Sequence, residues 1–311
     1  MRLKSFGKLL KENRSISFSN HSFVASFGNG RLGNQICNLA SLYAIYKEFR
    51  IPCYVSQYSY HTLSSTFYLN TSFDHSPRKF ITVRDVQNFT NLSWVYISNV
   101  DLMRRRHEVI SPYKYSWNLK IEPYVCDIKG ALPYINVLRK TYLKFLPEVK
   151  KRATHVLKRF RKQFSDNVML VSIHIRLTDI SYHLWKLFKI LTPRKEYYER
   201  AMMYITKNTH KQVLFLAFSD DTKNAKKMLL RDNKLSNRIL FPVFGDKDSS
   251  ANIILALLAH VDGSILSYST FGLWGALLRK TRSHIVFPKE IIETDIGMYV
   301  LDANITGVQF I

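Results

Sequence analysis

The stretch Phe27-Gly28-Asn29-Gly30-Arg31-Leu32-Gly33-Asn34-Gln35 decides how the first part of this chain folds. A short apolar run at 23–27 precedes it and a helical pattern at 35–50 follows it, so we expect a strand, a tight turn and a helix. Glycine has no Cβ, so Gly28, Gly30 and Gly33 let the backbone bend and lie close to a ligand. The helix N-terminus offers free N–H groups to an anion, and Arg31 adds a planar cation. The spacing of the glycines matches neither the dinucleotide fingerprint nor a Walker motif. The function of this turn must therefore be inferred together with the rest of the chain.

The overall composition is that of an ordinary folded protein, with an excess of positive charge. The 311 residues suffice for two domains, and 46% of them are hydrophobic. A net charge of +23 suits nucleic acid, an anionic membrane or a phosphorylated substrate. The basic residues are scattered, however, and no nucleic-acid-binding module is recognisable. We therefore expect no nucleic-acid partner, and a basic nucleic-acid-binding protein is the weakest of three hypotheses.

Cysteines and glycosylation sequons bear on the cellular compartment. Cys37, Cys53 and Cys126 form no metal-ligand spacing and allow either one disulfide with a free thiol or three buried thiols. No run of about 20 apolar residues is present, and the basic N-terminus lacks the apolar core of a signal peptide. The chain is thus expected either to be cytosolic or to have its targeting segment elsewhere. Six sequons favour a secretory lumen, and they begin at Asn13, Asn20, Asn70, Asn88, Asn91 and Asn304.

The chain is expected to consist of two α/β lobes with short additions at each end. After the first helix, a strand at 52–56 completes a β-α-β order typical of a parallel sheet. The region 57–125 is aromatic-rich and shows no clear pattern, and a basic helix at about 147–164 bridges the halves. The expected parts are a polar leader at 1–20, an N-terminal lobe at 21–150, a C-terminal lobe at 151–290 and a closing segment at 291–311.

The C-terminal half alternates strands and helices regularly. This alternation predicts a doubly wound, mostly parallel sheet, and hence an α/β fold. The closing segment after 290 is harder to assign. The expected strands lie at 168–175, 213–218, 238–244, 264–267 and 284–287, and the expected helices at 194–208, 222–231, 249–259 and 270–280.

Polar side chains follow three of these strands, at the point where each strand ends. Ligands of doubly wound sheets bind at the carboxyl ends of the strands, so we expect one pocket there. The three clusters are His174-Ile175-Arg176-Leu177-Thr178-Asp179, Ser219-Asp220-Asp221 and Tyr268-Ser269-Thr270-Phe271.

The side chains of these clusters suit a nucleotide diphosphate. Arg176 can hold a diphosphate through two hydrogen bonds, and His174 lies on the same face of its strand. Ser269 and Thr270 begin a helix, where phosphates bind. Either Asp220 or Asp221 can accept hydrogen bonds from a guanine.

Each residue also has a structural alternative. His174 can be a core histidine, and Arg176 with Asp179 can be a structural ion pair. Ser219 can cap a helix whose dipole Asp220 and Asp221 complement, and Ser269-Thr270 can be only a cap. Phe271 and Trp274 are more often core residues than cofactor contacts. Asp246-Lys247-Asp248 can hold a divalent cation, but we expect an ordinary loop there, and no zinc pattern is present.

Four motifs, in order, resemble the α-1,2-fucosyltransferases of glycosyltransferase family 11. The second of them is similar to the H-x-R-R-x-D motif shared with α-1,6- and protein O-fucosyltransferases. The resemblance covers residues 23–287. The motifs are Gly30-Arg31-Leu32-Gly33-Asn34-Gln35, His174-Ile175-Arg176-Leu177-Thr178-Asp179, Phe218-Ser219-Asp220-Asp221 and Ser269-Thr270-Phe271-Gly272-Leu273-Trp274-Gly275.

This resemblance implies a two-lobed, GT-B-like fold and a specific reaction. L-Fucose would move from GDP-fucose to the 2-position of a terminal galactose on a glycan, with inversion and without metal or other cofactor. The protein would belong to the Golgi lumen, attached to the membrane by an anchor that this chain does not show. Arg176 would clamp the diphosphate. The implied substrate-binding residues are Gly30, Arg31, Gly33, Asn34, His174, Asp220 or Asp221, Ser269, Thr270 and Phe271.

The expected mechanism is a single displacement in which Arg176 and two helix ends stabilise the departing GDP. A strong base is not required if bond breaking precedes attack; Asp179 is the first candidate for such a base and Glu196 the second. Leu177 stands where the family usually has a second arginine, which removes one expected cation, and Leu273 stands where many relatives have tryptophan. These departures leave a non-catalytic GDP-sugar-binding or glycan-binding relative as the second hypothesis.

Overall fold

Two separate parallel β-sheets form the framework of the protein. The computed structural model describes residues 23–69, 81–83, 94–113, 118–165, 167–242 and 251–311. The part built on the first sheet is called the N-terminal lobe below, and the part built on the second sheet the C-terminal lobe. All pairings between the named strands are parallel, which confirms the expected α/β, GT-B-like class.

The N-terminal lobe has a five-stranded sheet with the strand order β3-β2-β1-β5-β4. Its chain order reverses between β1 and β5, so the segments after these two strands leave the same point of the sheet edge. The strands are β1 (Val24–Ser26), β2 (Cys53–Val55), β3 (Ile81–Val83), β4 (Trp94–Ile97) and β5 (Asn118–Ile121), and the helices are α2 (Leu32–Phe49), α3 (Gln57–Ser64), α4 (Asn99–Ile110), α5 (Ile128–Ala131) and α6 (Ile135–Thr141).

The C-terminal lobe has a six-stranded sheet with the order β11-β10-β9-β6-β7-β8. Numbered along the chain, this is the 3-2-1-4-5-6 order of dinucleotide-binding folds, with its switch point between β6 and β9. The strands are β6 (Met169–Ile175), β7 (Val213–Ser219), β8 (Ile239–Leu240), β9 (Gly263–Leu266), β10 (Ile285–Phe287) and β11 (Val308–Phe310). The helices are α7 (Pro147–Phe164), α8 (Ile180–Phe188), α9 (Lys195–Lys207), α10 (Thr222–Leu230), α11 (Ala251–Leu258), α12 (Thr270–Leu277) and α13 (Asp295–Asp302).

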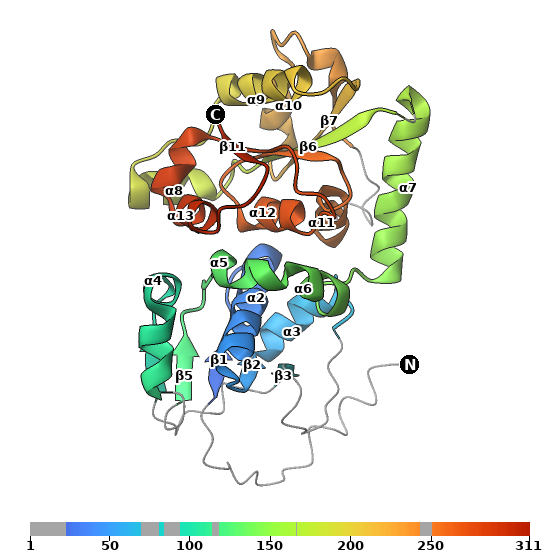
Figure 1. Ribbon diagram of the computed structural model, residues 1–311. Coiled ribbons are helices and arrows are strands. Elements are labelled where there is room, and N and C mark those ends of the chain that lie inside the picture. The colour runs from blue at the N-terminus through green and yellow to red at the C-terminus, as the bar shows by residue number, and fades with distance from the viewer. Residues whose placement is uncertain (1–22, 70–80, 84–93, 114–117, 166, 243–250) are drawn as a thin grey trace.

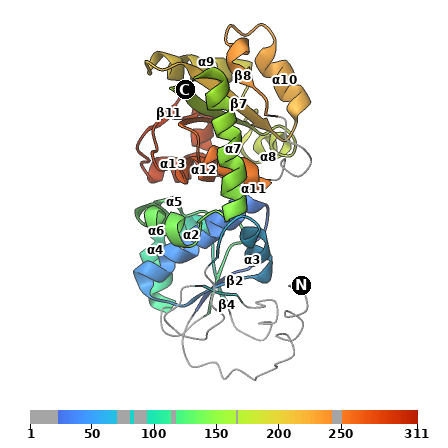
Figure 2. The same ribbon diagram turned by 90° about the vertical axis from the view of Figure 1, so that its right-hand side faces the viewer.

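Helix α7 runs along one side of the molecule from the N-terminal to the C-terminal lobe (Figures 1 and 2). Its apolar side chains recur every three or four residues, so they form one stripe that packs against α11. The buried members of the stripe are Val149, Ala153, Leu157 and Phe160. The bridging helix expected at 147–164 is thus confirmed to the residue.

The two lobes share one hydrophobic core. Helices α11, α12 and α13 of the C-terminal lobe face α2, α5 and α6 of the N-terminal lobe (Figure 1). Trp274 on α12 is completely buried, and its indole Nε1 donates a hydrogen bond to Cys37 Sγ on α2, 3.0 Å away. The lobes are therefore held by a packed apolar interface, which fixes the distance between their facing sheet edges.

The regularly alternating C-terminal strands and helices are confirmed, with small shifts at their ends. Helix α2 begins at Leu32, three residues before the expected start. Strand β8 ends at Leu240, and residues 243–244 of the expected strand lie outside the described residues. The closing segment contains α13 and β11, and β11 extends the C-terminal sheet. The expected domain boundary at 150 falls inside α7. The polar leader at 1–20 lies outside the described residues.

Among the three cysteines, Cys37 and Cys126 form a disulfide and Cys53 is a buried free thiol. This is one of the two arrangements that the sequence allows. In the described part of the chain, no helix is long and apolar enough to span a membrane. Asn304 is the one sequon asparagine within the described residues, and it is exposed; the other five lie outside them.

Candidate functional site at the facing sheet edges

A cavity of about 670 Å³ lies between the two lobes. It is bounded by the segments that follow β1 and β5 in one sheet and β6, β7 and β9 in the other, so it lies at the switch points of both sheets. Its volume is in the range of small-molecule sites. The lining residues are Gly30, Arg31, Leu32, Gly33, Asn34, Tyr124, His174, Ile175, Arg176, Asp179, His183, Phe218, Ser219, Asp220, Ala251, Ile254, Ser269, Thr270 and Phe271.

The glycine turn after β1 forms the N-terminal wall of the cavity. Gly28 and Gly30 have positive φ angles of 55° and 79°, a backbone conformation that favours glycine. The buried side chain of Gln35 holds the turn from inside, because its Nε2 donates to the backbone oxygens of Asn29 (2.7 Å) and Gly30 (3.2 Å). No side chain caps the N-terminus of α2, whose N-cap residue is Arg31. The first N–H groups of α2 are thus available to a ligand.

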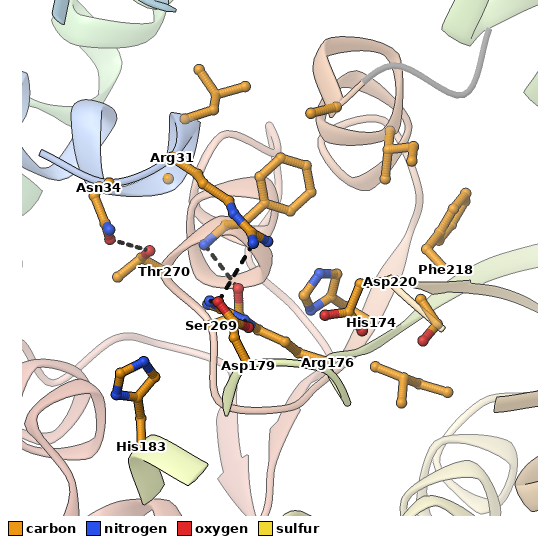
Figure 3. A pocket seen from close by; sticks show the side chains of 18 of the residues that line it. Arg31, Asn34, His174, Arg176, Asp179, His183, Phe218, Asp220, Ser269 and Thr270 are labelled. Atoms are coloured by element: carbon orange, nitrogen blue, oxygen red, sulfur yellow. Dashed lines mark hydrogen bonds and ion pairs between the residues drawn. The ribbon is translucent and has the colours of Figure 1, made fainter. Parts of the chain in front are cut away.

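The N-termini of α2 and α12 meet closely across the cavity. A Cβ on Gly33 would lie 2.5 Å from the backbone nitrogen of Phe271 and 2.8 Å from its Cα. Thr270 Oγ1 also donates a hydrogen bond to Asn34 Oδ1, 2.9 Å away and 236 residues distant in the sequence (Figure 3). Gly33 is therefore needed for the approach of the two lobes, a role that its place in the glycine turn does not reveal.

Arg176 and Asp179 form a two-pronged ion pair at the end of β6. The guanidinium Nε lies 2.9 Å from Asp179 Oδ1, and Nη2 lies 2.7 Å from Oδ2. Arg31 from the opposite lobe lies 3.5 Å from the same carboxylate (Figure 3). Asp179 uses two of the five N–H groups of Arg176, so the remaining ones can still bind an anion.

The ion pair also determines how Asp179 titrates. Its hydrogen bonds to Arg176, together with the charges of Arg176 and Arg31, lower the pKa of the carboxyl to about 2, although partial burial opposes this. The ion pair therefore contributes stability above the ordinary pKa of an aspartate and loses it as the pH falls toward 2. A carboxylate with so low a pKa is a weak base at neutral pH.

His174 is an almost completely buried, neutral side chain on β6. Burial, together with the charge of Arg176, lowers its pKa to about 4. Its ring lies 5.6 Å from the ring of Phe271, and its Nδ1 has no hydrogen-bond partner among the described residues. A Cβ on Gly272 would lie 3.0 Å from this nitrogen, so α12 packs closely on the histidine. His174 is thus a buried core histidine, as the structural alternative expects, and it also lines the cavity.

The two aspartates after β7 have different surroundings. Asp220 lines the cavity and organises the loop after β6, because it accepts hydrogen bonds from Leu177 N (2.8 Å) and Thr178 Oγ1 (2.6 Å). Asp221 is not one of the lining residues. Its side chain caps α10 by accepting from Asn224 N at 3.0 Å, so the structural alternative that named Ser219 as the cap of this helix is wrong.

Ser269, Thr270 and Phe271 all line the cavity at the start of α12. Ser269 is the N-cap, and its hydroxyl accepts a hydrogen bond from Phe271 N at 3.2 Å. The cap alternative is correct for Ser269, and the residue lies at the cavity as well. Because Ser269 and Arg176 line the same cavity, the dipole at the N-terminus of α12 favours an anion there.

The two departures from the family motifs do not face the cavity. Leu177 is absent from the lining residues and packs against the core on the opposite face of the C-terminal sheet. The expectation that Leu177 removes a cation from the site stays a prediction, because the packing of a leucine does not show where an arginine would reach. Leu273 is completely buried in the core shared by the lobes. Glu196, the second candidate base, is exposed on α9 and does not line the cavity.

Several lining residues are missed by the sequence analysis. Tyr124 follows β5, a strand too short to show a pattern, and His183 lies on α8, which the sequence analysis does not place. Ile254 lies on a helix that is expected correctly, but nothing in its local sequence indicates the cavity. Phe218 begins one of the four motifs, although no role is assigned to it there. The described residues contain no group of three or more His, Cys, Asp or Glu side chains that could hold a metal ion, and Asp246-Lys247-Asp248 lies outside them.

Two parallel sheets that face each other across one cavity define a two-lobed, GT-B-like α/β protein. The family model of glycosyl transferase family 11 matches residues 133–296, which is more than half of the chain. The chain belongs to this family. The match contains the segments after β6, β7 and β9, whereas the glycine turn lies outside it.

Curated relatives agree with this membership. Galactoside alpha-(1,2)-fucosyltransferase 2 of Oryctolagus cuniculus is 25% identical over 254 residues, covering 80% of this chain and 65% of the relative. Galactoside 2-alpha-L-fucosyltransferase SEC1 of Bos taurus is 24% identical, covering 80% and 62%. This chain thus spans slightly less than two thirds of both relatives.

The solved structure is that of the fucosyltransferase NodZ from Bradyrhizobium, with a TM-score of 0.51 and 13% identity. The similarity covers 84% of this chain and 93% of NodZ. At this identity the likeness concerns the fold.

Proposed function

We propose that the protein is a fucosyltransferase that moves L-fucose from GDP-fucose to a hydroxyl of a glycan. The observation that carries this proposal is the position of Arg176, whose unused N–H groups lie at a cavity reached by the N-termini of α2 and α12. Such a group of donors suits a diphosphate. Membership of family 11 and the names of the relatives support fucose as the transferred sugar.

The lining residues suggest a direction for the donor within the cavity. Phe218, Asp220 and His174 lie on one side of Arg176, and Asn34, Thr270 and His183 lie on the other (Figure 3). The first group offers aromatic surface and a carboxylate, which suit the guanosine. With the diphosphate at Arg176, the fucose would then point toward Asn34 and the N-terminal lobe.

The proposed chemistry is a single displacement with inversion and without metal. Arg176 and the two helix N-termini stabilise the negative charge that develops on GDP as the bond to fucose breaks. Asp179 orients Arg176 through their two hydrogen bonds, and its low pKa suits this positioning role better than that of a base. If the bond to GDP breaks ahead of attack, the acceptor hydroxyl requires little activation.

Isothermal titration with GDP-fucose, GDP and UDP-galactose, each with EDTA, tests the donor site. Guanine-specific binding that survives EDTA supports the proposal, whereas equal or absent binding of all three contradicts it. The Arg176→Ala variant should lose most of this affinity because it removes the proposed diphosphate clamp. Arg139→Ala is a suitable control, because Arg139 contacts Arg279 at the lobe interface and is not a lining residue.

The proposed acceptor is the 2-position of a terminal galactose, as the names of the relatives from Oryctolagus cuniculus and Bos taurus suggest. A panel of galactose-terminated and galactose-free oligosaccharides, with GDP-fucose as the donor, tests this choice. The linkage and the anomeric configuration of the product follow from NMR of the purified oligosaccharide. Transfer to any other position would contradict the proposed linkage but not fucosyl transfer itself.

We also propose that the protein works in the Golgi lumen, attached to the membrane by an anchor. The Cys37–Cys126 disulfide supports an oxidising compartment, because such bonds rarely persist in the cytosol. Resistance of Asn304 to glycosylation during expression in a secretory system, together with cytosolic staining of the native protein, would contradict this location.

The non-catalytic hypothesis is a second candidate, since Asp179 already occupies one edge of Arg176. A binding protein would take up GDP-fucose without turning it over on any acceptor or in water. Measurable hydrolysis or transfer by the purified chain excludes this hypothesis.

A further inference from the structure

Tyr124 is a half-exposed aromatic residue on a firmly held segment. Its exposed fraction is 52%, and it lines the cavity just after β5. On one side, Pro123 O accepts a hydrogen bond from Asn38 Nδ2 at 3.0 Å; on the other, Cys126 is tied to Cys37 by the disulfide. The exposure of the ring therefore does not come from a loosely held loop, and such rigid positions suit ligand binding.

The glycine turn lies between this ring and a second exposed tyrosine. A Cβ on Gly30 would lie 3.0 Å from Tyr124 Cε1, so the ring packs directly on the turn. On α3, the hydroxyl of Tyr58 donates to Gly30 O at 2.8 Å, and this residue is 51% exposed. Both rings belong to the N-terminal lobe and leave about half of their surface open to a ligand.

The chemistry of these rings differs from that of the opposite wall. Arg176, the start of α12 and Asp220 offer the charges and hydrogen-bonding groups that a nucleotide diphosphate needs, and all of them belong to the C-terminal lobe. Tyr124 is neutral and amphipathic. An aromatic face can pack on the apolar C–H face of a pyranose while the phenol oxygen stays among polar groups.

We propose that Tyr124 is the platform on which the terminal sugar of the acceptor glycan stacks, with Tyr58 extending the surface along the glycine turn. This inference rests on the proposed function and adds the residues that select a neutral, galactose-terminated acceptor. The acceptor enters from the N-terminal lobe, so that its hydroxyl meets the fucose that points away from the guanosine. Tyr124 thus affects acceptor binding and not donor binding.

Steady-state transfer to lactose or N-acetyllactosamine, whichever the wild type accepts, tests this assignment. Tyr124→Ala should raise the acceptor KM about tenfold, while the Kd of GDP-fucose from titration changes less than twofold. Tyr124→Phe, which keeps the ring, should stay within about threefold of the wild-type KM. Tyr68→Ala is the matched control, because Tyr68 is 59% exposed and does not line the cavity.

Hydrolysis of GDP-fucose by water, measured without acceptor, completes the test. The inference requires that Tyr124→Ala lower the rate of transfer to the acceptor far more than it lowers this hydrolysis. An unchanged acceptor KM in Tyr124→Ala, or a loss of donor affinity equal to the loss of acceptor affinity, overturns the inference alone. Failure of the wild type to bind GDP-fucose overturns the proposed function instead, so the two failures are distinguishable.

Discussion

The two walls of the cavity have the same backbone arrangement but present different side chains to the cavity. On each side a strand of a parallel sheet ends in a tight turn, and a helix begins there: β1 leads to α2, and β9 leads to α12. On the N-terminal side the wall consists of glycine backbone, an uncapped helix that carries Arg31 and Asn34, and the ring of Tyr124. On the C-terminal side a serine caps the helix, and β6 adds Arg176 and His174.

Because of this difference, substitutions in the two walls should have different effects. The C-terminal wall depends on charge and hydrogen bonding, so its substitutions should affect binding and turnover strongly. The N-terminal wall depends on close backbone approach and on covalent anchoring, so its substitutions should affect stability and the fit between the lobes. The four predictions below test this contrast.

The largest expected effect is on turnover, in Arg176→Ala. We expect at least a 10³-fold loss of kcat/KM, on the order of the effect of other arginines that stabilise a departing phosphate. The side chain is partly exposed, so the circular dichroism spectrum and thermal midpoint should change little. Arg31→Ala on the opposite wall is the comparison, with a smaller expected loss because its side chain is 74% exposed. Turnover close to wild type in Arg176→Ala would remove the proposed clamp.

Removal of the disulfide should give the largest loss of stability. The bond joins residues 89 positions apart, and its loss should lower the free energy of unfolding by about 4 kcal/mol in Cys37→Ser/Cys126→Ser. Urea denaturation measures this change. Cys53→Ala, which removes a buried thiol without removing a cross-link, should cost clearly less. Equal losses in the two variants would mean that the N-terminal wall does not depend on its covalent anchor.

The pH dependence of stability should report the burial of His174. Between pH 6.5 and about 4 the unfolded chain binds a proton here and the folded chain does not, so stability falls as the pH falls. The shift corresponds to about 3 kcal/mol, and the contribution levels off below pH 4. Urea denaturation at pH 7, 5.5 and 4 should show a shallower decline in His174→Gln than in the wild type. Identical declines would show that His174 titrates normally in the folded protein.

The smallest of the four effects is expected for Gly33→Ala. The new methyl group would meet the backbone of Phe271, which cannot move as a side chain can, and overpacking of this kind costs about 1–3 kcal/mol. Separation of the two helix N-termini should also weaken GDP binding in a titration. Asn34→Ala is the control, because it removes the hydrogen bond to Thr270 without adding atoms. A Gly33→Ala protein with wild-type stability and affinity would show that the lobes can separate freely.

The sequence predicts the C-terminal lobe better than the N-terminal lobe, for a physical reason. Strands β6 and β7 have seven residues each, nearly all of them buried, so both appear as predominantly apolar segments, which only Ser172 and His174 interrupt in β6. The described N-terminal strands have only three or four residues, too few to show a period. Helix α8 has only nine residues, so the helical spacing of Ile180, Leu184 and Phe188 extends over little more than two turns and is a weak signal.

The sequence also predicts some residues of the site and misses others. Register between β6 and β7 pairs Ile175 with Ser219, which brings Arg176 beside Asp220 as the order of the motifs implies. The distinction between Asp220 and Asp221 is not visible in the sequence, since either could have capped α10. Tyr124 reaches the cavity only because β5 pairs with β1, out of chain order.

The sequence by itself determines the alternation of strands and helices, the glycine turn and the polar residues that end each strand. These features depend on the periodicity of apolar residues and on backbone preferences, and both are set by the sequence within a few residues. Only the tertiary structure decides that Arg31 lies beside Asp179, that Gly33 faces Phe271 and that Tyr124 reaches the cavity. Each of these depends on which distant segment fills the space beside a side chain, and local sequence does not specify that neighbour.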